Sequence, residues 1–430
     1  MHGHSQYQSL WRLYKEVDMI DFEFTPIMKM AREFTHNYAR DVMRPIARKY
    51  DEEEHTEPTE FIQKTHEMFR SLGFSFSTAN ASGETEGKSE HKEKHERPKM
   101  EMNLLGAIAI EEIAWGCPGL TLRIPGPGLG GAAIMAAGTP EQKKRFMKVL
   151  NGPKPSYGAM ALTEPGFGSD ASAVATTAVK DGDYYILNGT KIFVTGGDMA
   201  DLYVVWATLG KDLGRAGIKA FVVEKGTPGL KMARLEHKLG IRASDTAEVV
   251  LEDCRVHKDN LLGGEKKEEK GFKGAMQTFD ATRPMVAAMA IGIARSAYDF
   301  VYEDFVVKNG LEINYGRPLH QRGYIETLLE DMEAKISAAR LLTWKAAWML
   351  DHSLPNLKEA SMAKAKAGTV VDEVTQKAIE LYGPEGYSRR NLLEKWMRDA
   401  KVYDVFEGTG QIQRLVVARA ILDYTRKELK

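Results

Sequence analysis

Cysteine is scarce in this sequence, and long apolar runs are missing. The chain of 430 residues has two cysteines, Cys117 and Cys254, far apart, which excludes a disulfide-stapled scaffold and favours a reducing compartment. No uninterrupted apolar run is long enough to cross a bilayer. The polar start of the chain, Met1 to His4, lacks the apolar core of a signal peptide. We therefore expect a cytoplasmic protein with no membrane segment.

The sequence also lacks an excess of charge of one sign. Lys and Arg number 59 against 60 Asp and Glu, which gives a formal net charge of −1. This balance favours neither a nucleic acid nor a membrane surface as a partner. What the chain does have is 43% hydrophobic residues, enough at this length for two or three domains with substantial cores.

The spacing of apolar residues divides the chain into three parts and predicts an α+β protein of several domains. Residues 1–155 predict a helical domain, residues 156–263 a β-barrel-like domain, and residues 264–430 a four-helix bundle. The expected helices of the first part are Arg40–Tyr50, interrupted at Pro45, and Leu104–Trp115. Those of the last part are Met289–Tyr302, Ile325–Leu350, Glu359–Leu381 and Asn391–Val402.

The middle part shows the alternation and turn residues of β-strands. Asn188-Gly189, between Tyr184–Leu187 and Lys191–Thr195, predicts a hairpin turn. Further strands are expected at Leu202–Thr208, Ile218–Glu224 and Thr246–Val256.

A polar segment of the first part, residues 77–99, predicts a mobile loop because it has almost no apolar content. Its His91 and His95 are flanked by lysines. They indicate a solvated face rather than a metal site.

Gly126 to Gly131 fits the Gly-x-Gly-x-x-Gly pattern of a dinucleotide-binding turn. A strand-like stretch, Leu120–Ile124, precedes it. However, Pro140–Leu150 reads as a helix where a second strand would follow, and no acidic residue ends such a strand about 20 residues later. We therefore favour a junction between helices over a nicotinamide-binding fold.

Glu407 is the candidate catalytic residue. It lies just ahead of a helix expected to begin near Gln411, and Val405 and Phe406 precede it. Apolar crowding would exclude water and raise its pKa, as a base for a weakly acidic C–H requires. The alternative is a surface glutamate that interacts with the helix dipole. The helix is expected from apolar residues at helical spacing, namely Ile412, Leu415, Val416, Ile421 and Leu422.

Two loops of the β part could contact a flat or anionic ligand. In Leu162–Asp170, Gly166 and Gly168 would allow close approach of backbone N–H groups, and a plain Pro-Gly turn is the alternative. In Phe193–Gly197, the phenyl ring could cover one face of a ring while Thr195 bonds its edge; the alternative is a core Phe and a turn.

A third run, Phe279–Pro284, precedes a long helix, and Pro284 is expected in the first helical turn. Arg283 could anchor a polar ligand group. The alternative is a solvated side chain.

Together these motifs resemble the acyl-CoA dehydrogenases, a family of flavoproteins. The resemblance runs from about Arg44 to the C-terminus, and its specificity comes from the order and separation of the motifs. It implies an N-terminal helical domain, a middle β domain and a C-terminal four-helix domain. The matching runs are Glu111–Gly116, Leu162–Asp170, Lys191–Gly197, Asp280–Pro284, Glu394–Lys401 and Phe406–Arg414.

The resemblance implies FAD between the β domain and the C-terminal bundle, and an acyl-CoA substrate. It implies that Glu407 removes the α proton while the β hydrogen leaves as hydride to the flavin, which gives a trans-2-enoyl-CoA. In some branches the base comes from the helix with the Asp-x-Thr-Arg motif, but Thr282 stands at that position and cannot serve. Residues implied around FAD are Leu162, Thr163, Gly168, Ser169, Phe193, Thr195, Thr409 and Gln411. Those implied at the substrate are Ser169, Asp280, Arg283 and Gly408.

Three positions depart from the family pattern. Where the family has an arginine and a glutamine for a neighbouring subunit's FAD, this chain has Glu312 and Gly323, and Glu380–Pro384 replaces a Gln-x-x-Gly-Gly segment. A carboxylate near a diphosphate is repulsive. This pattern suggests a heterotetramer with a second acyl-CoA dehydrogenase-like chain. The alternative is a homo-oligomer, a dimer of dimers, in which Arg317 or Arg322 takes over the diphosphate.

The resemblance also implies that electrons pass to an electron-transfer flavoprotein. An acyl-CoA oxidase, which would use oxygen, and a non-catalytic or half-site subunit of a heteromeric acyl-CoA dehydrogenase are the alternatives.

Overall fold

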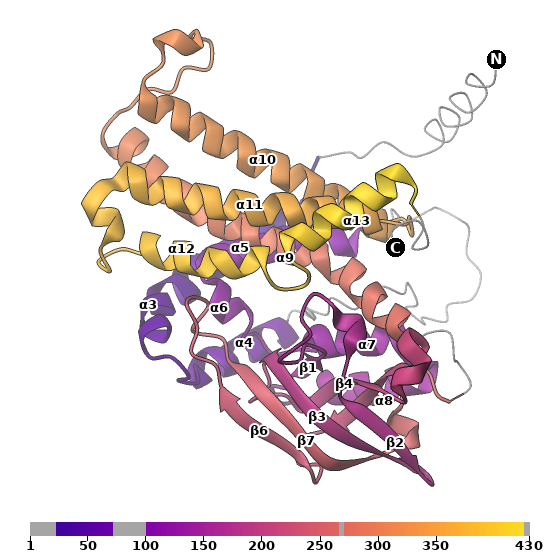
Figure 1. Cartoon of the computed structure of the whole chain (residues 1–430). Helices are drawn as coiled ribbons and strands as arrows, with labels where there is room; N and C mark the ends of the chain where they lie inside the picture. Colours follow the sequence, from indigo (N-terminus) through magenta and orange to yellow (C-terminus); the bar gives the residue numbers. More distant parts are fainter. Residues whose placement is uncertain (1–22, 72–99, 266–270, 425–430) are drawn as a thin grey trace, which may run out of the picture.

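The computed structural model describes residues 23–71, 100–265 and 271–424. The predicted loop at 77–99, with His91 and His95, lies outside these residues. Helices come first, strands follow and helices return, which confirms the predicted α+β class (Figure 1). The exact division at residues 155 and 263 stays a prediction. Among the described residues, no helix combines the length and apolarity that crossing a membrane requires.

The N-terminal part is helical, as predicted. Pro45 stands in the first turn of α3, where its missing N–H costs nothing, and a π-helical turn, Ala39–Met43, joins α3 to the preceding helix. The predicted interruption is therefore a change of helix type. The helices are α2 (Pro26–Tyr38), α3 (Arg44–Glu52), α4 (Thr59–Ser71), α5 (Met102–Gly116), α6 (Pro118–Thr121), α7 (Gly128–Ala137) and α8 (Pro140–Leu150).

The strand-like stretch Leu120–Ile124 does not form a strand in the structure. Pro118 opens the short helix α6, whose end is closed by a 2.9 Å hydrogen bond from the Thr121 hydroxyl to the Cys117 carbonyl. The glycine-rich run therefore joins two helices, which confirms the junction. Gly130 is needed for packing, because a Cβ there would lie 2.6 Å from the carbonyl carbon of Gly158 in the sheet.

Among the described residues, seven strands form one sheet with the order β1-β4-β2-β3-β7-β6, and β5 pairs with β4. Every residue of β4 is buried. The strands expected at Leu202–Thr208, Ile218–Glu224 and Thr246–Val256 are confirmed. The bounds are β1 (Gly158–Ala161), β2 (Thr177–Asp181), β3 (Tyr184–Thr195), β4 (Leu202–Thr208), β5 (Ile218–Glu224), β6 (Leu230–Leu235) and β7 (Thr246–His257).

The hairpin predicted at Asn188-Gly189 is wrong, because β3 runs straight through both residues. The register between β3 and β7 shifts there, as at a β-bulge. The Asn188 amide bonds Asp253 across the strands, at 3.1 Å to the carboxylate and 2.8 Å from the backbone N–H. A Cβ on Gly189 would lie 2.4 Å from the Thr176 hydroxyl. The Asn-Gly pair therefore serves a bulge and a close approach.

The C-terminal part contains the predicted long helices, which lie above the sheet in Figure 1. Buried alanines on α9 and α11, such as Ala294 and Ala363, let these helices pack closely. The bounds are α9 (Gly271–Tyr302), α10 (Tyr324–Asp351), α11 (Leu357–Tyr382), α12 (Leu393–Ala400) and α13 (Gly410–Leu422).

The expected place of Pro284 in a first helical turn is wrong, because α9 begins at Gly271 and Pro284 lies in its interior. An interior proline cannot donate to the carbonyl four residues earlier. That carbonyl belongs to Asp280, and the Asn356 side-chain amide lies 3.5 Å from it. A side chain from outside the helix thus replaces part of the missing backbone bond.

Candidate active site

Glu407 lies in the turn that leads into α13. Its φ of 53° is left-handed, and Gly408 follows with a φ of 93°. This φ favours glycine, and a Cβ on Gly408 would also lie 2.3 Å from the amide of the Gln413 side chain. The Thr409 hydroxyl then caps α13 by accepting from the Ile412 N–H at 3.3 Å. The predicted helix start is confirmed, and the strained glutamate is the kind of outlier found at functional sites.

The Glu407 carboxylate faces helix α9. The Thr282 hydroxyl donates to its Oε2 at 2.9 Å. Burial raises the pKa of Glu407, and the Thr282 hydrogen bond and the charges of Arg283 and Lys364 offset part of that rise. Within the part of the chain that the structure describes, the carboxylate therefore lies in a partly dry setting with one hydrogen-bond donor, an environment that suits a general base.

The two apolar residues that were expected to crowd Glu407 lie in different surroundings. Val405 is 52% exposed, and the Phe406 ring packs edge-on against Tyr403 at 4.9 Å between centroids. The partner that the sequence did not indicate is Thr282 on α9, more than a hundred residues earlier in the chain. The raised pKa of Glu407 was predicted from the sequence, and this hydrogen bond was not.

Two buried residues that the sequence reasoning missed hold this turn. The Lys364 ammonium, on α11, donates to the Gly408 carbonyl at 2.8 Å, and burial lowers the pKa of Lys364 to about 8. The Gln413 amide donates to the carbonyls of Glu407 and Gly408, at 3.2 Å each. A lysine among alanines on an otherwise apolar helix face was a readable signal for Lys364.

Asp280 and Arg283 stand one turn apart on α9 and form an ion pair of 2.7 Å. Arg283 is buried, so the alternative of a solvated side chain is wrong. Its Nε is buried without a hydrogen-bond partner among the described residues. Burial raises the pKa of Asp280, and Arg283 opposes that rise. The guanidinium thus has a donor left for a polar ligand group.

On the sheet side, the start of the Leu162–Asp170 loop is fastened to β3. The Ile192 N–H donates to the Thr163 carbonyl at 2.9 Å, and the Lys191 ammonium to the Leu162 carbonyl at 3.1 Å. Leu162 and Thr163, both expected near a cofactor, are therefore hydrogen-bonded to β3 through their backbone carbonyls.

Glu164 is the residue that fixes this loop, and the sequence reasoning gave it no role. Its buried carboxylate accepts from Lys191 at 2.7 Å, from the Thr176 hydroxyl at 2.5 Å and from the Ala175 N–H at 2.7 Å. Burial lowers the pKa of Lys191 to about 8, against the pull of Glu164. Glu164 thus ties the loop to β3 and to the residues just before β2 at once.

Phe193 is turned out of the sheet. The register between β3 and β7 shifts between Lys191 and Val194, and Phe193 has a left-handed φ of 55°. A bulge re-aims a side chain in this way. The ring is 61% exposed, so the alternative of a core Phe is wrong. Thr195, two residues on, is half-buried.

Gly168 and Ser169 lie on the exposed part of the loop, and Gln411 is exposed at the start of α13. A Cβ on Gly168 would meet no described atom within 4 Å. Nothing among the described residues therefore demands glycine at this position, and the space beside it is free for a ligand.

Family models match both halves of this site. The model for the acyl-CoA dehydrogenase middle domain matches residues 159–254, and that for the acyl-CoA dehydrogenase C-terminal domain matches residues 269–422. A short-chain specific acyl-CoA dehydrogenase of Clostridium acetobutylicum is 36% identical over 94% of this chain and 100% of the relative.

The chain belongs to the acyl-CoA dehydrogenase family. It is an enzyme of that family, an oxidoreductase, and the predicted resemblance is confirmed. An acryloyl-CoA reductase (NADH) of Anaerotignum propionicum is also 36% identical, over 96% of this chain and 99% of its own length.

Solved structures agree with the fold. Butyryl-CoA dehydrogenase from Megasphaera elsdenii superposes with a TM-score of 0.78 at 33% identity, over 94% of this chain and 100% of that one. A chain from a structure described as the electron transferring flavoprotein of Acidaminococcus fermentans gives 0.79 at 36% identity, with 94% and 100% covered. A glutaryl-CoA dehydrogenase in complex with glutaryl-CoA gives 0.79 at 29% identity, with 95% and 98% covered.

Proposed function

We propose that this chain catalyses the FAD-dependent α,β-dehydrogenation of an acyl-CoA thioester, with Glu407 as the general base. The observation that carries the proposal is the Glu407 carboxylate, desolvated and hydrogen-bonded by Thr282 across 2.9 Å. A carboxylate with a raised pKa is the stronger base that a C–H next to a thioester needs. The product is a trans-2-enoyl-CoA.

The residues on the sheet side fit a flat ring system. Phe193 presents an exposed ring at a bulge, Leu162 and Thr163 are fastened to β3, and Gly168 leaves open space. When bound, FAD supplies the acceptor for the β hydride. The residues that would hold it are Leu162, Thr163, Gly168, Ser169, Phe193, Thr195, Thr409 and Gln411.

On the helical side the chain's own groups divide the work on the substrate. Thr282 donates to Oε2 of Glu407, which leaves Oε1 to take the α proton. The backbone N–H of Glu407 would donate to the thioester carbonyl, where charge develops as the proton leaves. Lys364 and Gln413 keep that backbone turn in place. Asp280, Arg283, Ser169 and Gly408 would line the substrate.

Short acyl groups are the substrates we propose to test first. The supporting observation is that relatives at 36% identity and above carry names that specify short-chain acyl-CoA or acryloyl-CoA. A visible spectrum of the FAD-loaded chain, taken anaerobically before and after a panel of acyl-CoA thioesters, ranks them. Bleaching of the flavin band by butyryl-CoA is the expected result. A flavin that no acyl-CoA bleaches would contradict the proposed reaction.

For the electron acceptor we propose an electron-transfer flavoprotein. The match to a chain from the Acidaminococcus fermentans structure supports this choice. Reoxidation of the substrate-reduced enzyme by an electron-transfer flavoprotein, much faster than by dissolved oxygen, is expected. Faster reoxidation by oxygen would instead make the enzyme an acyl-CoA oxidase.

We further propose that the enzyme is an oligomer. Several of the apolar residues that predicted helix α13 are exposed, including Leu415 at 59%, Ile421 at 66% and Leu422 at 57%. Exposed apolar surface of this kind is typical of an interface. Light scattering of the purified chain, alone and with a second acyl-CoA dehydrogenase-like chain, measures the assembly.

Whether the chain assembles with copies of itself or with a second acyl-CoA dehydrogenase-like chain depends on the residues available to bind the FAD diphosphate. Glu312 is exposed, Arg317 pairs with Glu326 at 3.3 Å, and Arg322 pairs with Glu330. Both arginines therefore already have carboxylate partners within the chain, which favours a heterotetramer over a homo-oligomer. FAD at one per chain in a purified homotetramer would contradict this choice.

A further inference from the structure

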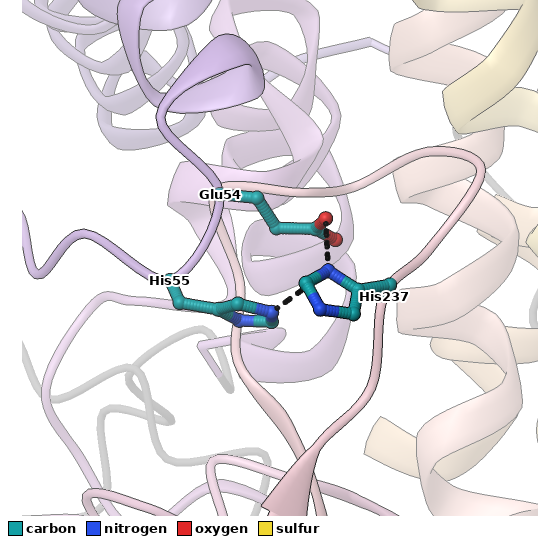
Figure 2. A group of neighbouring side chains, drawn as sticks. All are labelled: Glu54, His55 and His237. Carbon is teal, nitrogen blue, oxygen red and sulfur yellow. Dashed lines mark hydrogen bonds and ion pairs between the residues drawn. The ribbon is translucent and has the colours of Figure 1, made fainter.

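Three metal-ligating side chains meet where the N-terminal helices approach the sheet, in elements that contribute nothing to the proposed active site. Glu54 and His55 follow helix α3, and His237 follows strand β6. One ligand atom from each side chain lies within 4.8 Å of the other two. Figure 2 shows the carboxylate and the His55 ring both directed at the His237 ring.

Hydrogen bonding alone accounts poorly for this arrangement. Nδ1 of His237 lies 3.1 Å from Oε2 of Glu54 and 3.4 Å from Nε2 of His55. A ring nitrogen carries in its plane either one hydrogen or one lone pair. If it carries the hydrogen, Glu54 and His55 compete for it. If it carries the lone pair, that lone pair faces a carboxylate oxygen. A cation among the three atoms would satisfy all of them together.

We propose that Glu54, His55 and His237 bind a zinc ion. Two imidazoles and one carboxylate are a ligand set that Zn²⁺ prefers. Nitrogen and oxygen ligands at zinc distances in a tetrahedron stand about 3.3 Å apart, close to the two separations observed here. The side chain of His237 is 84% exposed, so an ion can enter from solvent and a water can complete the fourth position.

The surroundings orient the carboxylate ligand. The Lys238 N–H donates to Oε1 of Glu54 at 2.8 Å, and Oε2 of the same carboxylate lies 3.1 Å from Nδ1 of His237. A hydrogen bond that orients a ligand in this way is typical of metal sites.

The site would fix a loop that joins three parts of the chain. The loop after His237 reaches helix α12, where Ile241 N–H donates to Asp399 at 2.5 Å and Arg398 donates to the Leu239 carbonyl at 3.0 Å. A zinc ion at its base would tie this loop to the end of α3. Because the metal binds the folded state, it would raise the free energy of unfolding, and this gain would grow with the logarithm of the free zinc concentration once that concentration exceeds the dissociation constant.

The test is calorimetric titration of the chelator-treated, full-length chain with zinc chloride. We expect one zinc per chain in the wild type, no binding at this site in His237→Ala, and weaker binding in Glu54→Gln. Zinc should also raise the thermal midpoint of the wild type and leave that of His237→Ala unchanged. Equal midpoints of the two metal-free proteins show that His237→Ala is folded.

Histidines elsewhere in the chain provide the matched control. A variant with alanine at His2, His4, His91 and His95 should bind zinc as the wild type does. Loss of binding in that variant, unchanged affinity and stoichiometry in His237→Ala, or the absence of binding by the wild type would each overturn the proposal.

Discussion

At the scale of single residues, the candidate site depends on side chains and dihedral angles that are held against their preferences. Glu407 is charged in a water-poor place, Lys364 is buried, and Phe193 has a left-handed backbone. Each arrangement costs free energy that the surrounding fold must offset. Each therefore predicts an effect of substitution.

Lys364→Met should shift the pH dependence of catalysis. The Lys364 charge lowers the pKa of Glu407, so its loss raises that pKa. The acid limb of kcat/KM, where the base must be ionised, should move to higher pH. Loss of the charged hydrogen bond from Lys364, which leaves the Gly408 carbonyl with the Gln413 amide alone, should reduce the free energy of unfolding by about 1–3 kcal/mol.

Lys358→Met is the control for that variant, because the Lys358 side chain lies on the same helix and is 44% exposed. It should leave both the pH profile and the stability unchanged. Lys364→Arg should restore the profile in part. If the pH dependence of kcat/KM were the same in Lys364→Met and in the wild type, Lys364 would have no role in positioning Glu407 or setting its pKa.

Phe193→Gly should separate stability from cofactor binding. A left-handed backbone at a residue other than glycine strains the folded state by about 1–3 kcal/mol. Glycine removes this strain, but it makes the unfolded chain more flexible, which costs about 1 kcal/mol of stability. The thermal midpoint of the flavin-free protein should not fall, but bound FAD per chain should. In the control Asp253→Gly, which also starts from a left-handed φ of 48°, FAD content should not change. Equal FAD in Phe193→Gly and wild type would contradict the role of the ring.

At the scale of elements, the fold depends on close approaches between helices and the sheet. Gly130→Ala should force α7 away from β1, because its Cβ would lie 2.6 Å from a backbone carbon. We expect a loss of about 1–3 kcal/mol in the free energy of unfolding, measured by denaturant titration. Gly166→Ala has no described atom within 4 Å of the new Cβ and should unfold as the wild type does.

Element identity was largely predictable from the sequence, and element junctions were not. The strand Leu202–Thr208 and the helix Pro140–Leu150 have the predicted bounds, because their apolar spacing is regular and their ends carry turn or capping residues. Asn188-Gly189 was predicted to be a turn because a β-bulge uses the same residue types as a turn. Pro284 was expected at a helix start, but it lies inside α9, where Asn356 replaces part of the missing backbone hydrogen bond.

At the scale of the whole molecule, buried ion pairs join helices that are far apart in the chain. The carboxylate of Glu112 on α5 accepts from Arg295 on α9 and from Arg32 and His36 on α2. Glu111 accepts from Arg295 and from Arg340 on α10. The N-terminal and C-terminal helices therefore share one charged network.

Glu112→Gln should destabilise the whole protein by about 3–5 kcal/mol, because it leaves the largely buried Arg295 with one carboxylate partner fewer. Burial would raise the pKa of Glu112, but His36 and the arginines hold it far below its ordinary value of 4.5. The ionised carboxylate thus adds stability above pH 4.5 that is lost as the pH falls below it. Urea titrations should show the largest difference from wild type at neutral pH and a smaller one in acid. An equal difference at every pH would contradict this.

The parts of the candidate site that came from local sequence were predictable, and those that came from tertiary contacts were not. The turn around Glu407 and the cap at Thr409 follow from neighbouring residues. Thr282, Lys364 and Glu164 act across long stretches of chain. Only the fold brings such residues to their partners, so one sequence could name Glu407 but not what surrounds it.

The most direct test of the central claim is the anaerobic rate of flavin bleaching by the best acyl-CoA in three FAD-loaded proteins. Wild type and Glu373→Gln, a change at an exposed glutamate, should bleach at the same rate. Glu407→Gln should bind the thioester and bleach at least about 100-fold more slowly, since a general base contributes roughly 10²–10⁴-fold. Bleaching of Glu407→Gln at the wild-type rate would show that another group removes the α proton.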